Sequence, residues 1–201
     1  MAAIESTMMP LTSIAPAFSL PDTEGKTVSL NDAAGKQGTV ILFICNHCPY
    51  VKHIAPALAE LAKQYQDKGI AFIAINSNDI DAYPEDDLAH MKIEKQTRDY
   101  IFPYLLDETQ AVAHAYGAAC TPDLYFFGAE KELVYRGQFD DSRPHRISSG
   151  NYDSTKTPSS GESLSKAIDQ LLSGEQIDSM QRPSIGCNIK WKPGNAPDDQ
   201  V

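Results

Sequence analysis

Apolar residues follow patterns along the chain that predict a layered α/β domain. The segments 38–45 (GTVILFIC) and 70–76 (IAFIAIN) are almost continuously apolar and rich in β-branched residues, which is typical of central strands covered on both faces. Between them, apolar residues recur at helical spacing from Pro49 to Lys68, and Gly69 is expected to end that helix. These patterns predict a strand, a helix and a second strand at the centre of the fold.

Weaker patterns supply the remaining elements. Alternating runs predict β-hairpins, and helical spacing or an acidic first turn predicts helices. In chain order these elements are a hairpin at 17–30, an exposed helix that starts at Pro84, a strand at 104–107, a helix at 108–117, a hairpin at 123–140 and a helix at 162–174. The whole order predicts an α/β fold, in which a mixed central sheet carries helices on both faces.

The two ends of the chain and one internal segment show a different character. Residues 1–12 are expected to be a flexible N-terminus, and the polar, Ser/Pro-rich residues 142–160 are expected to be a long surface loop within one domain at 13–174. Residues 175–201 form a C-terminal arm. In SIGCNIKWKPG (184–194) apolar and polar positions alternate strictly, which predicts that the arm docks as an extended segment with Cys187 turned inward.

Composition and charge narrow the range of functions. The chain has 201 residues and a formal net charge of −10, and Lys190 and Lys192 are the nearest approach to a basic cluster. Nucleic acid and membrane lipid are therefore not expected as partners. The N-terminal sequence does not resemble a signal peptide, and no stretch approaches the roughly 20 apolar residues of a membrane span. We expect a cytoplasmic protein, in which four cysteines more often indicate catalysis, metal binding or packing than structural disulfides.

Two of the cysteines form the motif Cys45-Asn46-His47-Cys48, where the central strand meets the helix. One helical turn separates the two side chains, so a disulfide can close without rearrangement of the backbone. At or just before the helix N-cap, Cys45 is expected to be the low-pKa nucleophile, and Cys48 the resolving thiol. An imidazolium at His47 would favour the Cys45 thiolate further.

A Cys-x-x-Cys pair also occurs in zinc sites, which usually carry a second such pair. A metal site built from Cys45, Cys48, His47 and a distant cysteine is conceivable, but ligation by all three residues of one turn would strain that turn. We therefore expect neither a metal nor another cofactor. The same motif in a non-catalytic module that binds a metal or a partner remains an alternative.

The order of a strand, a Cys-x-x-Cys pair and a helix with an internal proline, Pro56, resembles the thioredoxin superfamily. The segment ACTPDLYFF is similar to the one in which a cis proline faces the cysteine pair, here Thr121–Pro122. Further segments from Ala15 to Gly194 resemble the peroxiredoxin-like, AhpC/TSA-type branch; they include FICNHCPYVKHIAPAL, INSNDIDAYPEDD and RPSIGCNIKWKPG. The resemblance implies a thioredoxin-like fold with an N-terminal β-hairpin and an insertion between the central strand and the cis-proline strand; the extended C-terminal arm adds to this fold.

The resemblance also implies a function. It favours a thiol–disulfide oxidoreductase in which Cys45 attacks a protein or small-molecule disulfide, Cys48 displaces the product, and an external thiol reductant restores the pair. Thr121–Pro122 would form the wall against which the substrate backbone lies, and Asn46 and His47 would tune the site. The alternative enzyme is a thiol peroxidase with Cys48 as the peroxidatic residue, because Cys45 holds the position of the threonine in peroxiredoxins.

Three further residues are possible auxiliaries of the site. Asp79 is a candidate for the acid that assists the resolving cysteine, although an Asn/Ser/Asp loop favours its interpretation as a turn former. Cys120 precedes the predicted cis bond, and we expect it to be a packed thiol. Cys187 is either a small apolar group or a third redox thiol that reaches Cys45 or Cys120.

Overall fold

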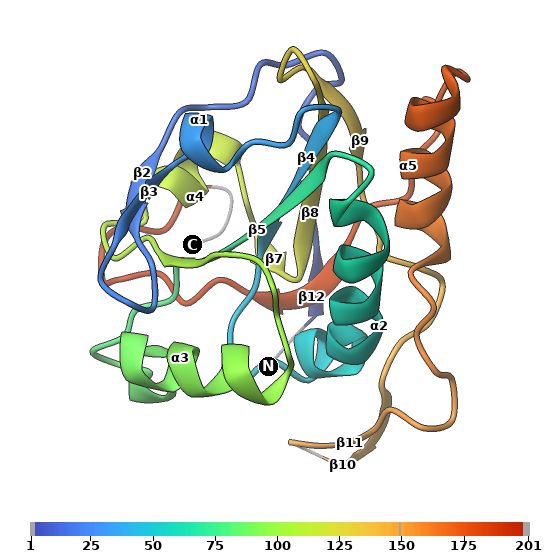
Figure 1. The fold of residues 1–201 in the computed structure, drawn as a ribbon. Helices are drawn as coiled ribbons and strands as arrows, with labels where there is room; N and C mark the ends of the chain where they lie inside the picture. Colours follow the sequence, from blue (N-terminus) through green and yellow to red (C-terminus); the bar gives the residue numbers. More distant parts are fainter. Residues whose placement is uncertain (1–2, 149, 199–201) are drawn as a thin grey trace.

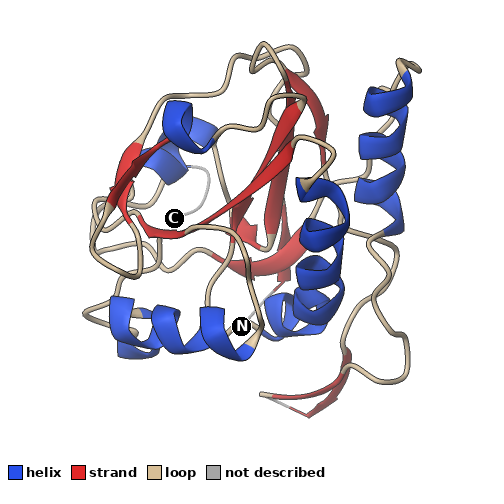
Figure 2. Cartoon of the chain, viewed as in Figure 1, coloured by secondary structure: helices blue, strands red, loops and turns tan. Residues whose placement is uncertain are grey.

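The computed structural model describes residues 3–148 and 150–198, which are built around a five-stranded mixed sheet (Figures 1 and 2). The strand order is β6 (Tyr104–Leu106), β5 (Ile70–Asn76), β4 (Gly38–Phe43), β8 (Asp123–Gly128) and β9 (Leu133–Arg136). β4 pairs in parallel with β5, as β5 does with β6, whereas β8 is antiparallel to both β4 and β9. The two continuous apolar runs are thus the central strands, as predicted.

Helices cover both faces of this sheet because successive side chains of a strand point to opposite sides. In β4, Val40 and Leu42 face one core, and Ile41 and Phe43 face the other. The first core is covered by α2 (Pro49–Gln66), α3 (Leu88–Thr97) and α5 (Glu162–Ser173). The second is covered by the hairpin β2 (Ser19–Pro21) and β3 (Thr27–Ser29), by α1 (Leu30–Ala33) and by α4 (Ala111–Tyr116). Among the described residues, none of the helices is long and apolar enough to cross a membrane.

A second, three-stranded sheet joins both ends of the chain to the region of the cysteine motif. Its order is β1 (Ala3–Glu5), β12 (Ile185–Asn188) and β7 (Cys120–Thr121), with antiparallel pairing throughout. The sequence predicts a flexible N-terminus, whereas residues 3–5 form a paired strand because β12 offers them backbone hydrogen-bond partners. The first two residues lie outside the described part. The extended docking of the arm agrees with the prediction.

The prediction that one face of the arm is apolar needs a correction. Cys187 packs in the core under α2, but Ile189 and Trp191 pack in the core on the other side of the central sheet. Lys190, expected on the polar face, is 7% exposed, and its Nζ donates to the backbone and side-chain oxygens of Asn188. The arm thus passes along the edge of both cores. Its alternating apolar side chains therefore enter two different cores and do not form one buried face.

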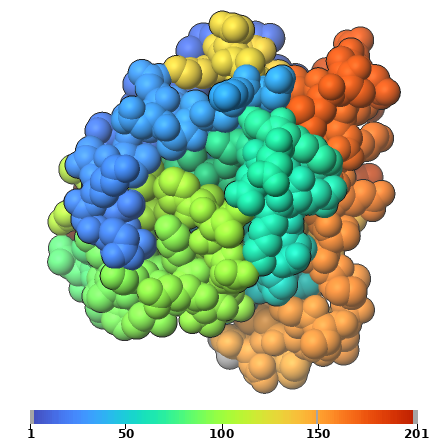
Figure 3. Space-filling model, viewed as in Figure 1, coloured from blue at the N-terminus to red at the C-terminus, as the bar shows by residue number. Residues whose placement is uncertain are grey.

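The predicted surface loop at 142–160 contains a hairpin of β10 (His145–Ser148) and β11 (Asn151–Asp153), with residue 149 outside the described part. The hairpin projects from the body of the molecule at the lower right of Figures 1 and 3, below the N-terminal end of α2. The ring of Tyr152 lies 6.4 Å from that of Tyr50 in α2. The insertion therefore has a defined structure that reaches the helix carrying the cysteine motif.

The helix predicted to start at Pro84 also differs in detail. Pro84–Asp86 form a 3-10 turn, and the α-helix begins at Leu88 with Asp87 as its N-cap, whose side chain accepts a hydrogen bond from the N–H of His90. Asp87 caps this start, as short acidic side chains commonly do. The 3-10 turn matters because it directs Asp86 toward the cysteine motif.

Candidate redox site

The cysteine motif lies between the end of β4 at Phe43 and the start of α2 at Pro49. Cys48 is the N-cap of α2, so Cys45 lies three residues before the cap. The sequence analysis places Cys45 at or just before the cap. Proline suits the first helical position because its ring fixes a helical φ and its missing N–H would have no partner there. The helix therefore begins after the second cysteine, and the positive end of its dipole lies at Cys48.

Cys48 is fully buried among hydrogen-bond donors. Although burial opposes ionisation, the thiols of Cys187 and Cys45 and the backbone N–H groups of Val51 and Cys187 lower the pKa of Cys48 well below its ordinary value. When protonated, Cys48 donates to the carbonyl oxygen of Thr121 at 3.0 Å, which favours the thiol. Four donors outweigh this one acceptor, so the negative charge of the cluster is most stable on Cys48.

Cys45 has the opposite electrostatics. Burial raises its pKa well above the ordinary value, and the hydrogen bond to Cys48 and the nearby carboxylate of Asp86 raise it further. Its Sγ lies 3.5 Å from Oγ1 of Thr121. These directions favour the proton on Cys45 and the charge on Cys48. The sequence leads us to expect the opposite roles; the donors around Cys48 and the burial of Cys45 beside Asp86 account for the difference.

Asp86 fixes the turn between the cysteines. Its Oδ1 accepts a hydrogen bond from the backbone N–H of Asn46 at 2.8 Å, and its Oδ2 accepts from Asn78 and lies 2.8 Å from Nδ1 of His47. The side chain of Asn46 bridges Glu85 and Tyr104. Sequence patterns do not identify Asp86, since an acid just after Pro84 reads as favourable charge at a helix start. Asn46 and Asp86 together hold the motif in place.

His47 is not a solvated residue of an exposed turn, because its side chain is only 14% exposed. Its ring stacks on that of Tyr83 with centroids 5.6 Å apart. Cys45, His47 and Asp86 each place one potential ligand atom within 4.8 Å of the others, so these are the described residues that could hold a metal ion. The set differs from the one considered from sequence, because Asp86 takes the place of Cys48 and a distant cysteine.

A surface pocket beside the motif connects it with the inserted hairpin. His47, Pro49 and Lys52 line one side, and residues of the hairpin, including Arg146 and Tyr152, line the other. The side chains of Lys52 and Arg146 bring positive charge to this pocket, although the chain has a net negative charge. The segment that the sequence presents as a surface loop thus contributes to the surroundings of the site.

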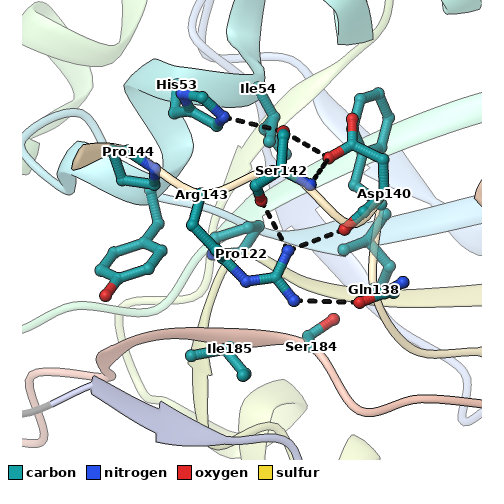
Figure 4. A pocket seen from close by; sticks show the side chains of 13 residues that line it. His53, Ile54, Pro122, Gln138, Asp140, Ser142, Arg143, Pro144, Ser184 and Ile185 are labelled. Carbon is teal, nitrogen blue, oxygen red and sulfur yellow. Dashed lines mark hydrogen bonds between the residues drawn. The ribbon is translucent and has the colours of Figure 1, made fainter. Parts of the chain in front are cut away.

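The predicted substrate wall also lies beside the cysteines. The Thr121–Pro122 peptide bond is cis, and Thr121 contacts the sulfur atoms of both Cys45 and Cys48. Pro122 lines a second pocket together with Tyr50 and Ile185 (Figure 4).

The rear of the second pocket is a polar network from the segment after β9. Nη1 of Arg143 donates to the carbonyl oxygen of Asp140 at 2.7 Å, and Nη2 donates to Oε1 of Gln138 at 2.9 Å. Ser142 joins Asp140 to Nε2 of His53 (Figure 4). Burial lowers the pKa of His53, although the carboxylate of Asp140 opposes this shift. The network ties the start of the insertion to α2 and so shapes the pocket at Pro122.

Asp79 and Cys120, two of the possible auxiliaries of the site, have contacts that indicate structural roles. Oδ1 of Asp79 accepts hydrogen bonds from the N–H groups of Asp81 and Ala82, which is the behaviour of a turn former. Cys120 is fully buried, its Sγ contacts the carbonyl oxygen of Pro122, and burial raises its pKa. Both arrangements agree with the simpler of the two interpretations of each residue.

Asp123, directly after Pro122, is a buried acid that sequence patterns do not single out. Burial raises its pKa to about 7, although the N–H of Ala119 and the hydroxyl of Tyr125 donate to its Oδ2. The unfolded chain loses this proton near pH 4, so the contribution of Asp123 to stability is full below that pH and is lost as the pH rises through about 7.

Substitution of Asp123 by asparagine is therefore expected to change the pH dependence of stability. The free energy of unfolding of Asp123→Asn minus that of the unmodified chain should rise by a few kcal/mol between pH 4 and pH 7 and level off above pH 8. Urea unfolding of the reduced proteins at a series of pH values measures this difference. A difference that does not vary with pH would show that the pKa of Asp123 is the same in the folded and the unfolded chain.

Comparison with known proteins adds to this geometry. The model of the AhpC/TSA family matches residues 11–136. The thiol-disulfide oxidoreductase ResA of Halalkalibacterium halodurans is 28% identical over 119 residues, which are 58% of this chain; the chain spans 62% of the length of that relative.

Two solved structures extend the comparison to the fold. An uncharacterized conserved protein from Geobacillus kaustophilus is 50% identical, with a TM-score of 0.89 over 96% of this chain and 98% of the other. The thioredoxin domain of a thiol-disulfide oxidoreductase from Bacteroides vulgatus is 21% identical, with a TM-score of 0.55 over 64% of this chain and 88% of the other. The fold is thioredoxin-like, as the sequence predicts.

Proposed function

Because this chain belongs to the AhpC/TSA family, we propose that it is a thiol–disulfide oxidoreductase whose redox pair is Cys45 and Cys48. The observation that carries the proposal is the pair of buried thiols at the start of α2 that both contact Thr121, with the charge favoured on Cys48. A thiolate is the species that attacks disulfides, and a neighbouring thiol is what releases the resulting mixed disulfide. The similarity to ResA supports the same class of chemistry.

The surroundings of the pair suggest the course of the reaction. Cys48 attacks a disulfide of a protein or a small molecule, and a neighbouring thiol then displaces the second product. The electrons come from the cysteines, so an external thiol reductant is needed and an organic cofactor is not. The pocket beside His47 is the proposed approach for the substrate, because β12 pairs with β7 at the Thr121–Pro122 wall. We retain the cytoplasm as the proposed compartment.

A thiol peroxidase is the second candidate, and the N-cap position of Cys48 favours it. In this reaction the Cys48 thiolate attacks a hydroperoxide, whose O–O bond breaks, so that Cys48 becomes a sulfenic acid and an alcohol or water leaves. Condensation with a neighbouring thiol then forms a disulfide and releases water. Both candidates use the same nucleophile and differ only in the oxidant.

Turnover of the two oxidants separates these candidates. The reduced protein should accelerate reduction of insulin disulfides by a dithiol, and turnover of hydrogen peroxide, measured in parallel, tests the peroxidase. Cys48→Ser should be inactive with either oxidant, whereas Cys120→Ala is a matched control at a buried thiol that should remain active. Failure with both oxidants, together with stoichiometric metal that is lost in Asp86→Asn, would instead establish a metal-binding module.

A further inference from the structure

The C-terminal arm occupies the wall that was assigned to the substrate. In the pairing of β12 with β7, Cys187 lies opposite Thr121 and Asn188 lies opposite Cys120. A Cβ atom placed on Gly186 would lie only 2.0 Å from the carbonyl oxygen of Thr121 and 3.0 Å from the nitrogen of Pro122. The backbone of the arm is therefore seated directly on the Thr121–Pro122 peptide unit, where an extended substrate would lie.

This seating brings a third thiol to the redox pair. The Cys187 side chain is 3% exposed and packs in the same core cluster as Cys45 and Cys48. Its cross-strand partner Thr121 accepts a hydrogen bond from the Cys48 thiol at 3.0 Å, and the thiol and the backbone N–H of Cys187 both lower the pKa of Cys48. Cys48 thus has a thiol neighbour on each side, one from its own turn and one from a segment more than 130 positions later in the chain.

We propose that Cys187 is a third redox thiol, which forms a disulfide with Cys48 and so links the C-terminal arm to the start of α2. The proposal rests on the proposed function, since it requires Cys48 to react with an oxidant. It assigns the arm a substrate-like position, because β12 presents a cysteine to Cys48 from the wall at Thr121–Pro122. The sequence pattern leaves Cys45 or Cys120 as the partner of Cys187, whereas the structure assigns Cys48.

The chemistry balances with a disulfide as the oxidant. Cys48 attacks one sulfur of the substrate disulfide, the S–S bond breaks, and the other substrate sulfur leaves as a thiolate that takes up a proton. Cys187 then loses its proton and attacks the Cys48 sulfur. A Cys48–Cys187 bond forms, the mixed disulfide breaks, and the second substrate thiol leaves. The substrate gains two electrons, and the two cysteines lose them.

The surroundings of Cys187 suit it to the second step. Pairing of β12 with β7 holds Cys187 opposite Thr121, whose carbonyl oxygen lies 3.0 Å from the Cys48 sulfur. The Cys48 thiolate and burial raise the pKa of Cys187, and the first of these causes disappears once Cys48 is bound in a mixed disulfide. Lys190, two residues after Cys187, also favours the Cys187 thiolate. Consumption of the Cys48 charge therefore activates a thiol that is already held beside it.

Peptide mapping under non-reducing conditions tests the proposal. The full chain and its variants Cys45→Ser, Cys187→Ser and Cys120→Ala are reduced, freed of reductant and treated with a small excess of oxidised glutathione. Cys45→Ser should yield an intramolecular Cys48–Cys187 disulfide and release two equivalents of glutathione thiol. Cys187→Ser should yield only the Cys45–Cys48 disulfide. Cys120→Ala should give the same disulfides as the unmodified chain.

The outcomes separate this proposal from the proposed function. If Cys48 reacts with glutathione disulfide but Cys45→Ser stops at the mixed disulfide, the redox role of Cys187 is refuted while the function stands. If Cys48 does not react in the unmodified chain, the proposed function itself fails. Loss of fold in Cys187→Ser would not obscure the result, because the decisive disulfide is sought in Cys45→Ser, where Cys187 is intact.

Discussion

Substitution of Cys48 by serine is expected to lower disulfide turnover on the order of a thousandfold or more, because it removes the attacking atom. Substitution of Cys45 by serine should leave the first attack within about tenfold of its original rate, since a serine hydroxyl still donates a hydrogen bond to the Cys48 thiolate. The sequence alone predicts the reverse order. The difference follows from the partners of each sulfur, because donors of Cys187 and Val51 surround Cys48, whereas burial and Asp86 raise the pKa of Cys45.

Alkylation of the reduced proteins as a function of pH measures the same assignment directly. In the unmodified chain Cys48 should be labelled below pH 7, where an ordinary thiol is almost fully protonated. Cys45 and Cys187 should stay unlabelled there, because burial and the Cys48 charge hold both pKa values up. Preferential labelling of Cys45 at mildly acidic pH would restore the roles that the sequence predicts. Cys120→Ala serves as the control for labelling of a packed thiol.

The sequence predicts most of the fold because its strongest signals are local. The apolar run in β4, the helical spacing in α2 and the positive φ of Gly69 depend only on neighbouring residues. The hairpin of β10 and β11 is not predicted, since its strands are rich in polar residues and lack the alternation that marks a half-buried strand. The strand β1 is not predicted either, because it pairs with β12, a strand near the other end of the chain.

The candidate site divides in the same way. The Cys45–Cys48 spacing and the Thr121–Pro122 dipeptide are short motifs, and the structure brings both together. The roles of the two cysteines depend on partners from distant segments, since Thr121 contacts both sulfur atoms and Cys187 packs in the same core cluster. Asp86 reaches the site through a 3-10 turn, so no local pattern marks it.

Gly186 is the position at which the docked arm should be most sensitive to substitution. A valine there would place its Cβ 2.0 Å from the carbonyl oxygen of Thr121 and 2.5 Å from the Thr121 carbonyl carbon. Both atoms belong to the backbone, so no side-chain rotation relieves the contact. We expect Gly186→Val to displace β12 and to lower the free energy of unfolding by roughly 3 kcal/mol or more, measured by urea unfolding.

Displacement of β12 should also expose the redox pair. Cys48 and Cys187 are buried with the arm in place. At a pH where Cys48 is ionised in both proteins, Cys48 of Gly186→Val should therefore be alkylated at least about tenfold faster than Cys48 of the unmodified chain. The matched control is Asn188→Val on the same strand, whose side chain is exposed and whose stability should change by about 1 kcal/mol or less. Near-UV circular dichroism at the labelling temperature distinguishes a displaced arm from an unfolded chain. If Gly186→Val is folded and its Cys48 is labelled no faster, the arm does not limit access to the site, and the route to Cys48 must run through the pocket beside His47.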